Sequence, residues 1–137
     1  MNAVLDTNVL ISGVISTGVA HDVVVAGFRG KYQLVVSEET VTEFEATLEK
    51  YPEKFNMSEQ EIQVEVTTVR MFADFVEPEA SFSVIEDDPD DDKFLEAAVA
   101  GTADYLVSGD SHLLELDSFR DVRIVDPRTF LEILASD

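Results

Sequence analysis

The chain has 137 residues and no cysteine, and its 9 Lys and Arg stand against 29 Asp and Glu, giving a formal net charge of −20 at pH 7. At this length we expect residues 1–137 to form a single domain. The lack of thiols excludes disulfides, thiolate metal sites and cysteine nucleophiles. The excess of acid runs against the cationic surface that phosphate binding ordinarily needs. It is typical of a halophile-like acidic surface, whose self-repulsion is screened by concentrated salt.

Membrane insertion and secretion both find no support in the sequence. No apolar run approaches the roughly 20 residues that a membrane span requires. The N-terminal residues also lack the basic start, long apolar stretch and small-residue cleavage site of a signal peptide. We therefore expect a soluble cytoplasmic protein that has no membrane partner.

Short apolar runs alternate with longer amphipathic stretches, which predicts an α/β domain with a mostly parallel sheet. Ser37 is expected to cap a helix whose apolar residues are spaced three and four apart and form one buried face. Ser58 and Glu61 have the spacing of a capping box at the start of a second such helix. In the first half we expect strands over 3–5 and 33–36, helices over 9–14 and 20–28, the Ser37 helix with Val41, Phe44 and Leu48 inside, and the Ser58 helix with Ile62, Val66, Val69 and either Phe72 or Ala73 inside.

The second half continues this alternation. Gly101 is expected to close a helix, and Asp126 followed by Pro127 is a strong start signal for a terminal helix. In this half we expect strands over 82–85, 105–107 and 122–125, a helix over 94–100, and the terminal helix after Asp126.

Acidic residues follow the predicted strands at one edge of the sheet. Asp6 follows the first strand directly, and Asp110 lies one turn after the strand over 105–107. Ligands of open parallel sheets bind beyond the carboxyl ends of the strands, so both side chains would lie at the same edge if the strands are neighbours. Glu43 in the helix after Ser37, and Asp92 at the start of the next helix, can reach the same cleft.

Such a cluster of carboxylates predicts a site for divalent cations. Carboxylates a few ångströms apart repel one another unless a cation lies between them. Oxygen ligands favour hard ions such as Mg²⁺ or Mn²⁺. A pair of these ions can activate a water molecule and stabilise the leaving oxygen of a phosphodiester. This chemistry needs no Ser, Cys or His nucleophile, and the sequence offers no convincing one.

The chain contains four motifs in order, with Glu43 between the first two: Val4 to Ile11 (VLDTNVLI), Asp87 to Ala98 (DDPDDDKFLEAA), Asp104 to Asp110 (DYLVSGD) with Leu113 and Leu114, and Ile124 to Pro127 (IVDP) with Phe130 and Leu131. Together they resemble the PIN-domain family, and in particular its VapC-like toxin ribonucleases. The resemblance implies a three-layer α/β/α sandwich with a mostly parallel central sheet. It also implies an Mg²⁺- or Mn²⁺-dependent endoribonuclease with an RNA substrate, which a small antitoxin protein inhibits and which forms a homodimer.

The same resemblance suggests roles for individual residues. The metal ligands and catalytic residues would be Asp6, Glu43, Asp92 and Asp110, with Thr7, Asn8 and Ser111 in support. Within the acidic run Asp92 best matches the family position, but Asp91 lies one residue away and Asp88 one helical turn earlier. Asp87 and Asp90 are expected to be solvated.

Two departures from the family keep other functions open. Many members carry a second Asp two residues after the position of Asp110, where this chain has His112, and few cations are available to bind RNA. Arg120, Arg123 and Arg128, near the last strand, are the best candidates for that contact. The alternatives are a catalytically weak PIN-like module that binds a protein partner and an RNA-processing nuclease that is not a toxin. A generic phosphohydrolase ranks lowest, since Asn8 stands where its second Asp would be.

Overall fold

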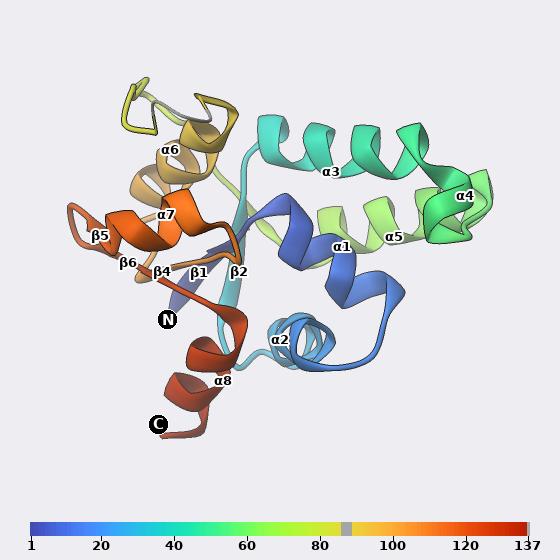
Figure 1. Ribbon diagram of the computed structural model, residues 1–137, viewed down its shortest axis with the longest axis horizontal. Helices are drawn as coiled ribbons and strands as arrows, with labels where there is room; N and C mark the ends of the chain where they lie inside the picture. Colours follow the sequence, from blue (N-terminus) through green and yellow to red (C-terminus); the bar gives the residue numbers. More distant parts are fainter. Residues whose placement is uncertain (86–88, 137) are drawn as a thin grey trace.

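Six strands form one twisted sheet in the computed structural model, which describes residues 1–85 and 89–136 (Figure 1). The strand order across the sheet is β3-β2-β1-β4-β6-β5, and neighbouring strands are parallel except for β5, which is antiparallel to β6. The strands are β1 (Asn2–Leu5), β2 (Gln33–Val36), β3 (Asp74–Phe75), β4 (Tyr105–Val107), β5 (Ser118–Phe119) and β6 (Val122–Val125). The predicted mostly parallel sheet is therefore confirmed.

Strand side chains alternate between two apolar cores, one on each face of the sheet. In β1, Ala3 and Leu5 join one core while Val4 joins the other. The same alternation in β4 sends Val107 to the first core and Leu106 to the second. Successive side chains of a strand point to opposite faces, so both faces of this sheet must be covered by helices.

Helices cover both faces and complete the predicted three-layer α/β/α sandwich. The first core is built with residues from α1 (Thr7–Ile15), α2 (Val19–Phe28), α3 (Glu38–Lys50), α4 (Pro52–Phe55), α5 (Glu59–Phe72) and α8 (Pro127–Ala135). The second core is built with residues from α6 (Asp92–Ala100), which follows the short 3₁₀ turn η1 (Pro89–Asp91), and α7 (Ser111–Leu116). Figure 1 shows α6 and α7 together on one side of the sheet. Among the described residues no single helix is long and apolar enough to cross a membrane, and α1 and α2 pass that test only as a pair bent by 91°.

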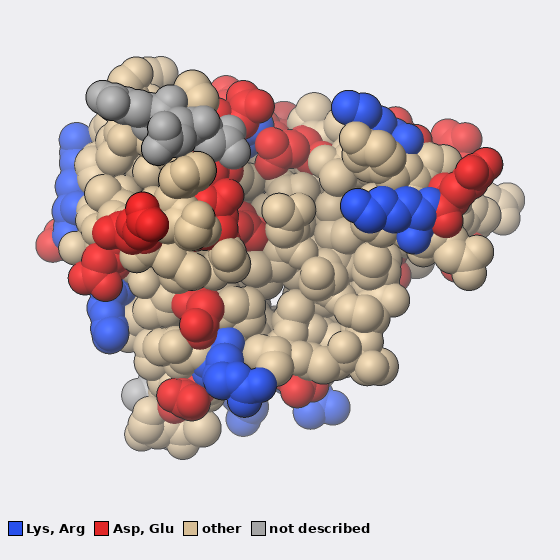
Figure 2. Space-filling model, in the orientation of Figure 1, with Lys and Arg blue, Asp and Glu red and all other residues tan. Residues whose placement is uncertain are grey.

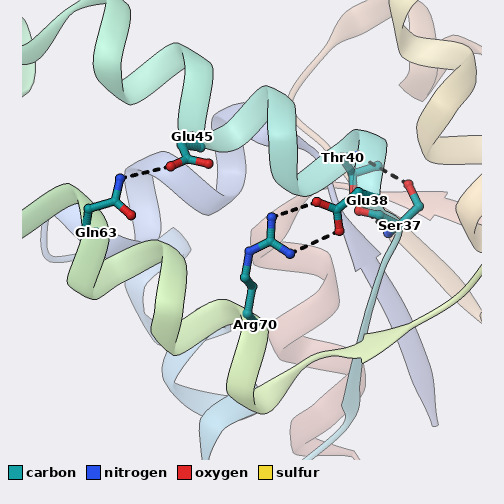
Figure 3. Close-up of polar contacts among 6 residues, drawn as sticks. All are labelled: Ser37, Glu38, Thr40, Glu45, Gln63 and Arg70. Carbon is teal, nitrogen blue, oxygen red and sulfur yellow. Dashed lines mark hydrogen bonds and ion pairs between the residues drawn. The ribbon is translucent and has the colours of Figure 1, made fainter.

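The helix that carries Glu43 is fixed at its start and along its length (Figure 3). Ser37 and Thr40 form a capping box at the N-terminus of α3, as the sequence predicts for Ser37. Arg70 of α5 donates two hydrogen bonds to Glu38, with N–O distances of 3.0 and 2.8 Å. Val41, Phe44 and Leu48 are buried as predicted, so α3 has one defined orientation against the sheet.

One predicted strand is absent, and two short strands, β3 and β5, were missed. Residues 82–85 do not pair as a strand, because side chains of α6 satisfy their backbone: the N–H of Phe82 donates to Glu96, and those of Val84 and Ile85 donate to Asp92. The strand at the edge of the sheet beside β2 is β3, which pairs with the end of β2. Of the two candidates at the end of α5, Ala73 packs against the first core, whereas Phe72 is 53% exposed.

Candidate active site

Three neighbouring parallel strands, β1, β4 and β6, each lead within a few residues to an aspartate that caps the next helix. Asp6 caps α1, Asp110 caps α7 and Asp126 caps α8, and in each case the carboxylate accepts a hydrogen bond from a backbone N–H of the first turn. Such caps satisfy donors that have no partner within the helix. The capping geometry also fixes each carboxylate at the carboxyl edge of the sheet. As predicted, β1 and β4 are neighbours, so Asp6 and Asp110 lie at the same edge.

Asp6 is the most deeply buried of these three aspartates, with an exposed fraction of 4%. Its Oδ1 accepts from the N–H of Val9 at 2.9 Å, and its Oδ2 accepts from the hydroxyl of Ser108. Burial raises the pKa of Asp6 from its ordinary value, and the neighbouring carboxylates of Asp110 and Glu43 raise it further, although the bonds from Ser108 and Val9 oppose the shift. Asp6 therefore has two carboxylate neighbours close enough to disfavour its own ionisation.

Ser108 also joins Asp6 to Asp110. While its hydroxyl donates to Asp6, its Oγ accepts from the backbone N–H of Asp110 at 2.9 Å. The Asp110 carboxylate in turn accepts from the N–H of His112 at 2.8 Å, and the Nδ1 of His112 lies 3.7 Å from the same Oδ1. Ser108 and Asp6 are buried, so the bond between them is shielded from solvent.

Glu43 reaches the same edge from the second turn of α3. One of its oxygens, Oε2, accepts from the hydroxyl of Thr7, and the other, Oε1, lies 3.0 Å from the Nζ of Lys93 on α6. Thr7 directly follows Asp6 in the chain, so this contact brings the Glu43 side chain to the residue beside Asp6. Thr7 thus contacts the site through Glu43, and its supporting role stays a prediction.

The acidic run contributes Asp90 and Asp91 to the cleft, whereas Asp92 lies elsewhere. Asp92 is 5% exposed, and its Oδ1 accepts two hydrogen bonds of 3.0 Å from the backbone N–H groups of Val84 and Ile85. The alternative of Asp88, together with Asp87, lies outside the described residues. Of the two described candidates for the ligand from the acidic run, Asp91 is the one that the structure brings to the other acids.

These residues line one polar cleft of about 180 Å³. Its lining consists of Asp6, Thr7, Asn8, Glu43, Thr47, Asp90, Asp91, Phe94 and Asp110. Figure 2 shows acidic side chains gathered in the hollow between α6 and α3. A family model described as a PIN domain matches residues 2–112. The chain belongs to the PIN domain family.

Every residue that lines the cleft falls within the matched range of the PIN domain. No curated protein matches the chain. PIN domains are generally metal-dependent nucleases and typically use divalent metal ions. The cleft in this PIN domain is open, polar and acidic, as a site for hydrated divalent cations requires.

The donor set of the cleft fits a hard divalent ion. All of its charged lining groups are carboxylates, the ligands that Mg²⁺ and Mn²⁺ prefer. Across residues 1–85 and 89–136, no three Asp, Glu or His side chains are already close enough together to hold a metal ion. Asp6, Glu43 and Asp110 are each held by groups of the protein itself, so this PIN domain keeps its carboxylates apart through hydrogen bonds and one lysine.

Sequence reasoning missed two residues of this PIN domain. Ser108 was not singled out, although a Ser at the buried end of β4, two residues before Asp110, is placed to bond both neighbouring Asp residues. Thr47 lines the cleft because it follows Glu43 by one helical turn. Ser111, which was expected to support the site, is exposed. The N-cap of α7 is Asp110 and Ser111 is the first residue of that helix.

The cations expected to contact RNA are not among the described residues that line the cleft. The guanidinium of Arg120 lies over the rings of Phe82 and Phe119, at 4.6 and 5.4 Å from their centroids. Arg123 is exposed on β6. On the face drawn in Figure 2, most Lys and Arg side chains lie away from the acidic hollow.

Proposed function

We propose that this PIN domain is an Mg²⁺- or Mn²⁺-dependent endoribonuclease that hydrolyses phosphodiester bonds of RNA. The observation that carries the proposal is the convergence of Asp6, Glu43, Asp91 and Asp110, from four separate segments, on one polar cleft. Bound there, divalent ions would supply an activated water molecule and stabilise the charge of the leaving oxygen.

In this proposal each acid has a role set by its hydrogen bonds. Asp6, Glu43 and Asp110 are the metal ligands, and the N-cap contacts of Asp6 and Asp110 fix their orientation before an ion arrives. Asp91 is the fourth ligand in place of Asp92, because Asp91 lines the cleft and the Oδ1 of Asp92 accepts from the loop over 84–85. Asn8 is exposed in the first turn of α1 and lines the cleft, where its amide can contact the substrate.

We further propose that the enzyme is a cytoplasmic toxin of a toxin–antitoxin pair, covered by a small antitoxin protein. Support comes from the resemblance of its motifs to VapC-like toxins and from the apolar surface of α5. Val64, Met71 and Phe72 are 62%, 76% and 53% exposed, which leaves apolar area for a protein partner to cover. The expected homodimer could also use such a surface, and sizing chromatography at high salt tests for the dimer.

The nuclease proposal is tested by incubating a mixed RNA pool with the purified protein and Mn²⁺ or Mg²⁺, at low and at high KCl. We expect cleavage that EDTA abolishes and that the Asp6→Asn variant lacks. Asp22→Asn, which removes the same charge from an exposed position on α2, is the matched control and should cleave as the wild type does. Equal cleavage by Asp6→Asn would assign the activity to a contaminant. No cleavage by the folded protein in either salt would replace the nuclease by an inert PIN-like module that binds a partner.

The toxin proposal needs a separate experiment. Induced expression of the wild-type chain should arrest bacterial growth, whereas Asp6→Asn at the same protein level should not. Metal-dependent cleavage without growth arrest would identify an RNA-processing nuclease that is not a toxin.

A further inference from the structure

Lys93 lies at the edge of the acidic cleft and makes an ion pair with one of its acids. Its Nζ is 3.0 Å from Oε1 of Glu43, and the two side chains are 19% and 27% exposed. Thr7 donates to the other oxygen of Glu43, so both oxygens of this carboxylate have a partner from the chain. Lys93 is in the first turn of α6, directly after the acidic run that supplies Asp90 and Asp91 to the cleft.

The surroundings of Lys93 are strongly negative. Asp6, Glu43, Asp90, Asp91 and Asp110 line the cleft, and no Lys or Arg is among its described lining residues. Carboxylates this close destabilise one another unless a positive charge is near. The Lys93 ammonium provides such a charge without occupying the cleft itself.

We infer that Lys93 is a built-in counter-ion of the metal site: it neutralises Glu43 in the metal-free protein and competes with the divalent ion for Oε1. The inference rests on the proposed function, because it assumes that Glu43 is a metal ligand. An ammonium is a monovalent point charge on a flexible stem, so a divalent ion can displace it from a carboxylate. Lys93 thereby sets the metal affinity below the value that the acids alone would give.

The structure also offers the displaced ammonium a place to move. A second hollow of about 400 Å³ is lined by Lys93 and by Glu43, which it shares with the cleft, and also by Glu38, Glu39, Thr42 and Ala46. In that hollow the ammonium can stay close to Glu39 after it leaves Glu43, while both oxygens of Glu38 already accept from Arg70. Displacement therefore exchanges one carboxylate neighbour for another, which lowers its cost.

The inference is tested by titrating Mn²⁺ into the full chain in a calorimeter at fixed KCl, for the wild type, Lys93→Gln and Lys93→Arg. Lys93→Gln should bind Mn²⁺ about tenfold more tightly, since a unit charge beside the ion has been removed, and Lys93→Arg should bind close to the wild-type value. Lys54→Gln is the matched control, because this substitution removes the same charge at a distant position, where Lys54 lies over the rings of Tyr51 and Phe55. It should leave the Mn²⁺ affinity unchanged.

A second readout needs no metal. In EDTA, Lys93→Gln should melt at a lower temperature than Lys54→Gln, because Glu43 and its neighbours lose their counter-ion. Unchanged or weaker Mn²⁺ binding by Lys93→Gln, with binding still lost in Asp6→Asn, would overturn the role of Lys93 and leave the nuclease proposal standing. Absence of Mn²⁺ binding by the wild type would overturn both.

Discussion

The hydroxyl of Ser108 donates a hydrogen bond to Oδ2 of Asp6 and so joins the carboxyl ends of two adjacent parallel strands. The same oxygen of Ser108 accepts from the N–H of Asp110, so one buried hydroxyl links the two aspartates at this edge. The site is thus held together by a side chain that is not expected to bind metal. This arrangement makes the stability of the sheet edge and the geometry of the cleft depend on each other.

Replacing Ser108 by Ala should destabilise the protein and weaken the metal site together. The substitution leaves Oδ2 of Asp6 and the N–H of Asp110 without their buried partner, at a cost of about 1–3 kcal/mol in the free energy of unfolding. Loss of a group that orients a ligand typically weakens metal binding about tenfold or more. Urea unfolding and Mn²⁺ titration measure the two effects. Ser16→Ala, at an exposed Ser whose hydroxyl bonds a helix carbonyl, is the control. If both variants behave alike, Ser108 does not link the site to the fold.

In the metal-free protein, Asp6→Asn should be more stable than the wild type at neutral pH, and its advantage should grow as the pH rises. The pKa of Asp6 is raised above its ordinary value of 3.8, mainly by burial, so folding favours the protonated carboxyl. Its contribution to stability is complete below pH 3.8 and is lost as the pH rises through the higher folded pKa. Asn avoids this loss and keeps an oxygen for the N–H of Val9. In EDTA at neutral pH we expect the melting temperature to rise by about 3–4 °C, on the order of 1 kcal/mol for a chain of this size, and the gain should vanish below pH 3.8.

Asp126→Asn provides a control with the opposite dependence on pH. Hydrogen bonds from Thr129 lower the pKa of Asp126, so its ionised form stabilises the fold, and that contribution is lost as the pH falls through the folded pKa. Its substitution should therefore lower the melting temperature at neutral pH and have no effect in strong acid. A uniform gain from both variants would show only the relief of overall negative charge.

Asp91 and Asp92 should respond differently to the loss of charge. Asp91→Asn is expected to weaken Mn²⁺ binding, because its carboxylate lines the cleft. Asp92→Asn should bind Mn²⁺ nearly as well as the wild type, since an amide oxygen can still accept from Val84 and Ile85. Asp92→Ala removes that acceptor and should cost about 1–3 kcal/mol of stability. A loss of Mn²⁺ affinity in Asp92→Asn as large as in Asp91→Asn would make Asp92 the ligand.

The net charge of −20 should make stability depend on salt. Repulsion among exposed acids weakens as the screening length falls to about 3 Å at 1 M salt. We expect the melting temperature in EDTA to rise with KCl, most steeply below about 1 M. Sucrose, which carries no charge, should not reproduce that steep rise. Full stability at low salt and neutral pH would contradict the halophile-like interpretation of the surface.

Local patterns in the sequence determined most of the helices and strands. The local features that lie where the sequence predicts them are the cap at Ser37, the capping box at Ser58, the Asp126–Pro127 start of α8 and the strands over 33–36, 105–107 and 122–125. These features depend on residues a few positions apart, whose spacing the sequence displays directly. The sequence also placed Asp6 and Asp110 after strands, but their meeting at one edge required β1 and β4 to be neighbours, which the fold decided.

Only the tertiary structure decided which neighbouring side chains enter the cleft. Asp91 and Asp92 are adjacent at the start of α6, and the choice between them depends on the loop over 84–85, whose backbone N–H groups bind Asp92. That loop replaces the strand predicted over 82–85. The bond of Ser108 to Asp6 spans 102 positions and that of Lys93 to Glu43 spans 50. Such contacts form between segments that the fold brings together, so no periodicity or spacing within one segment can reveal them.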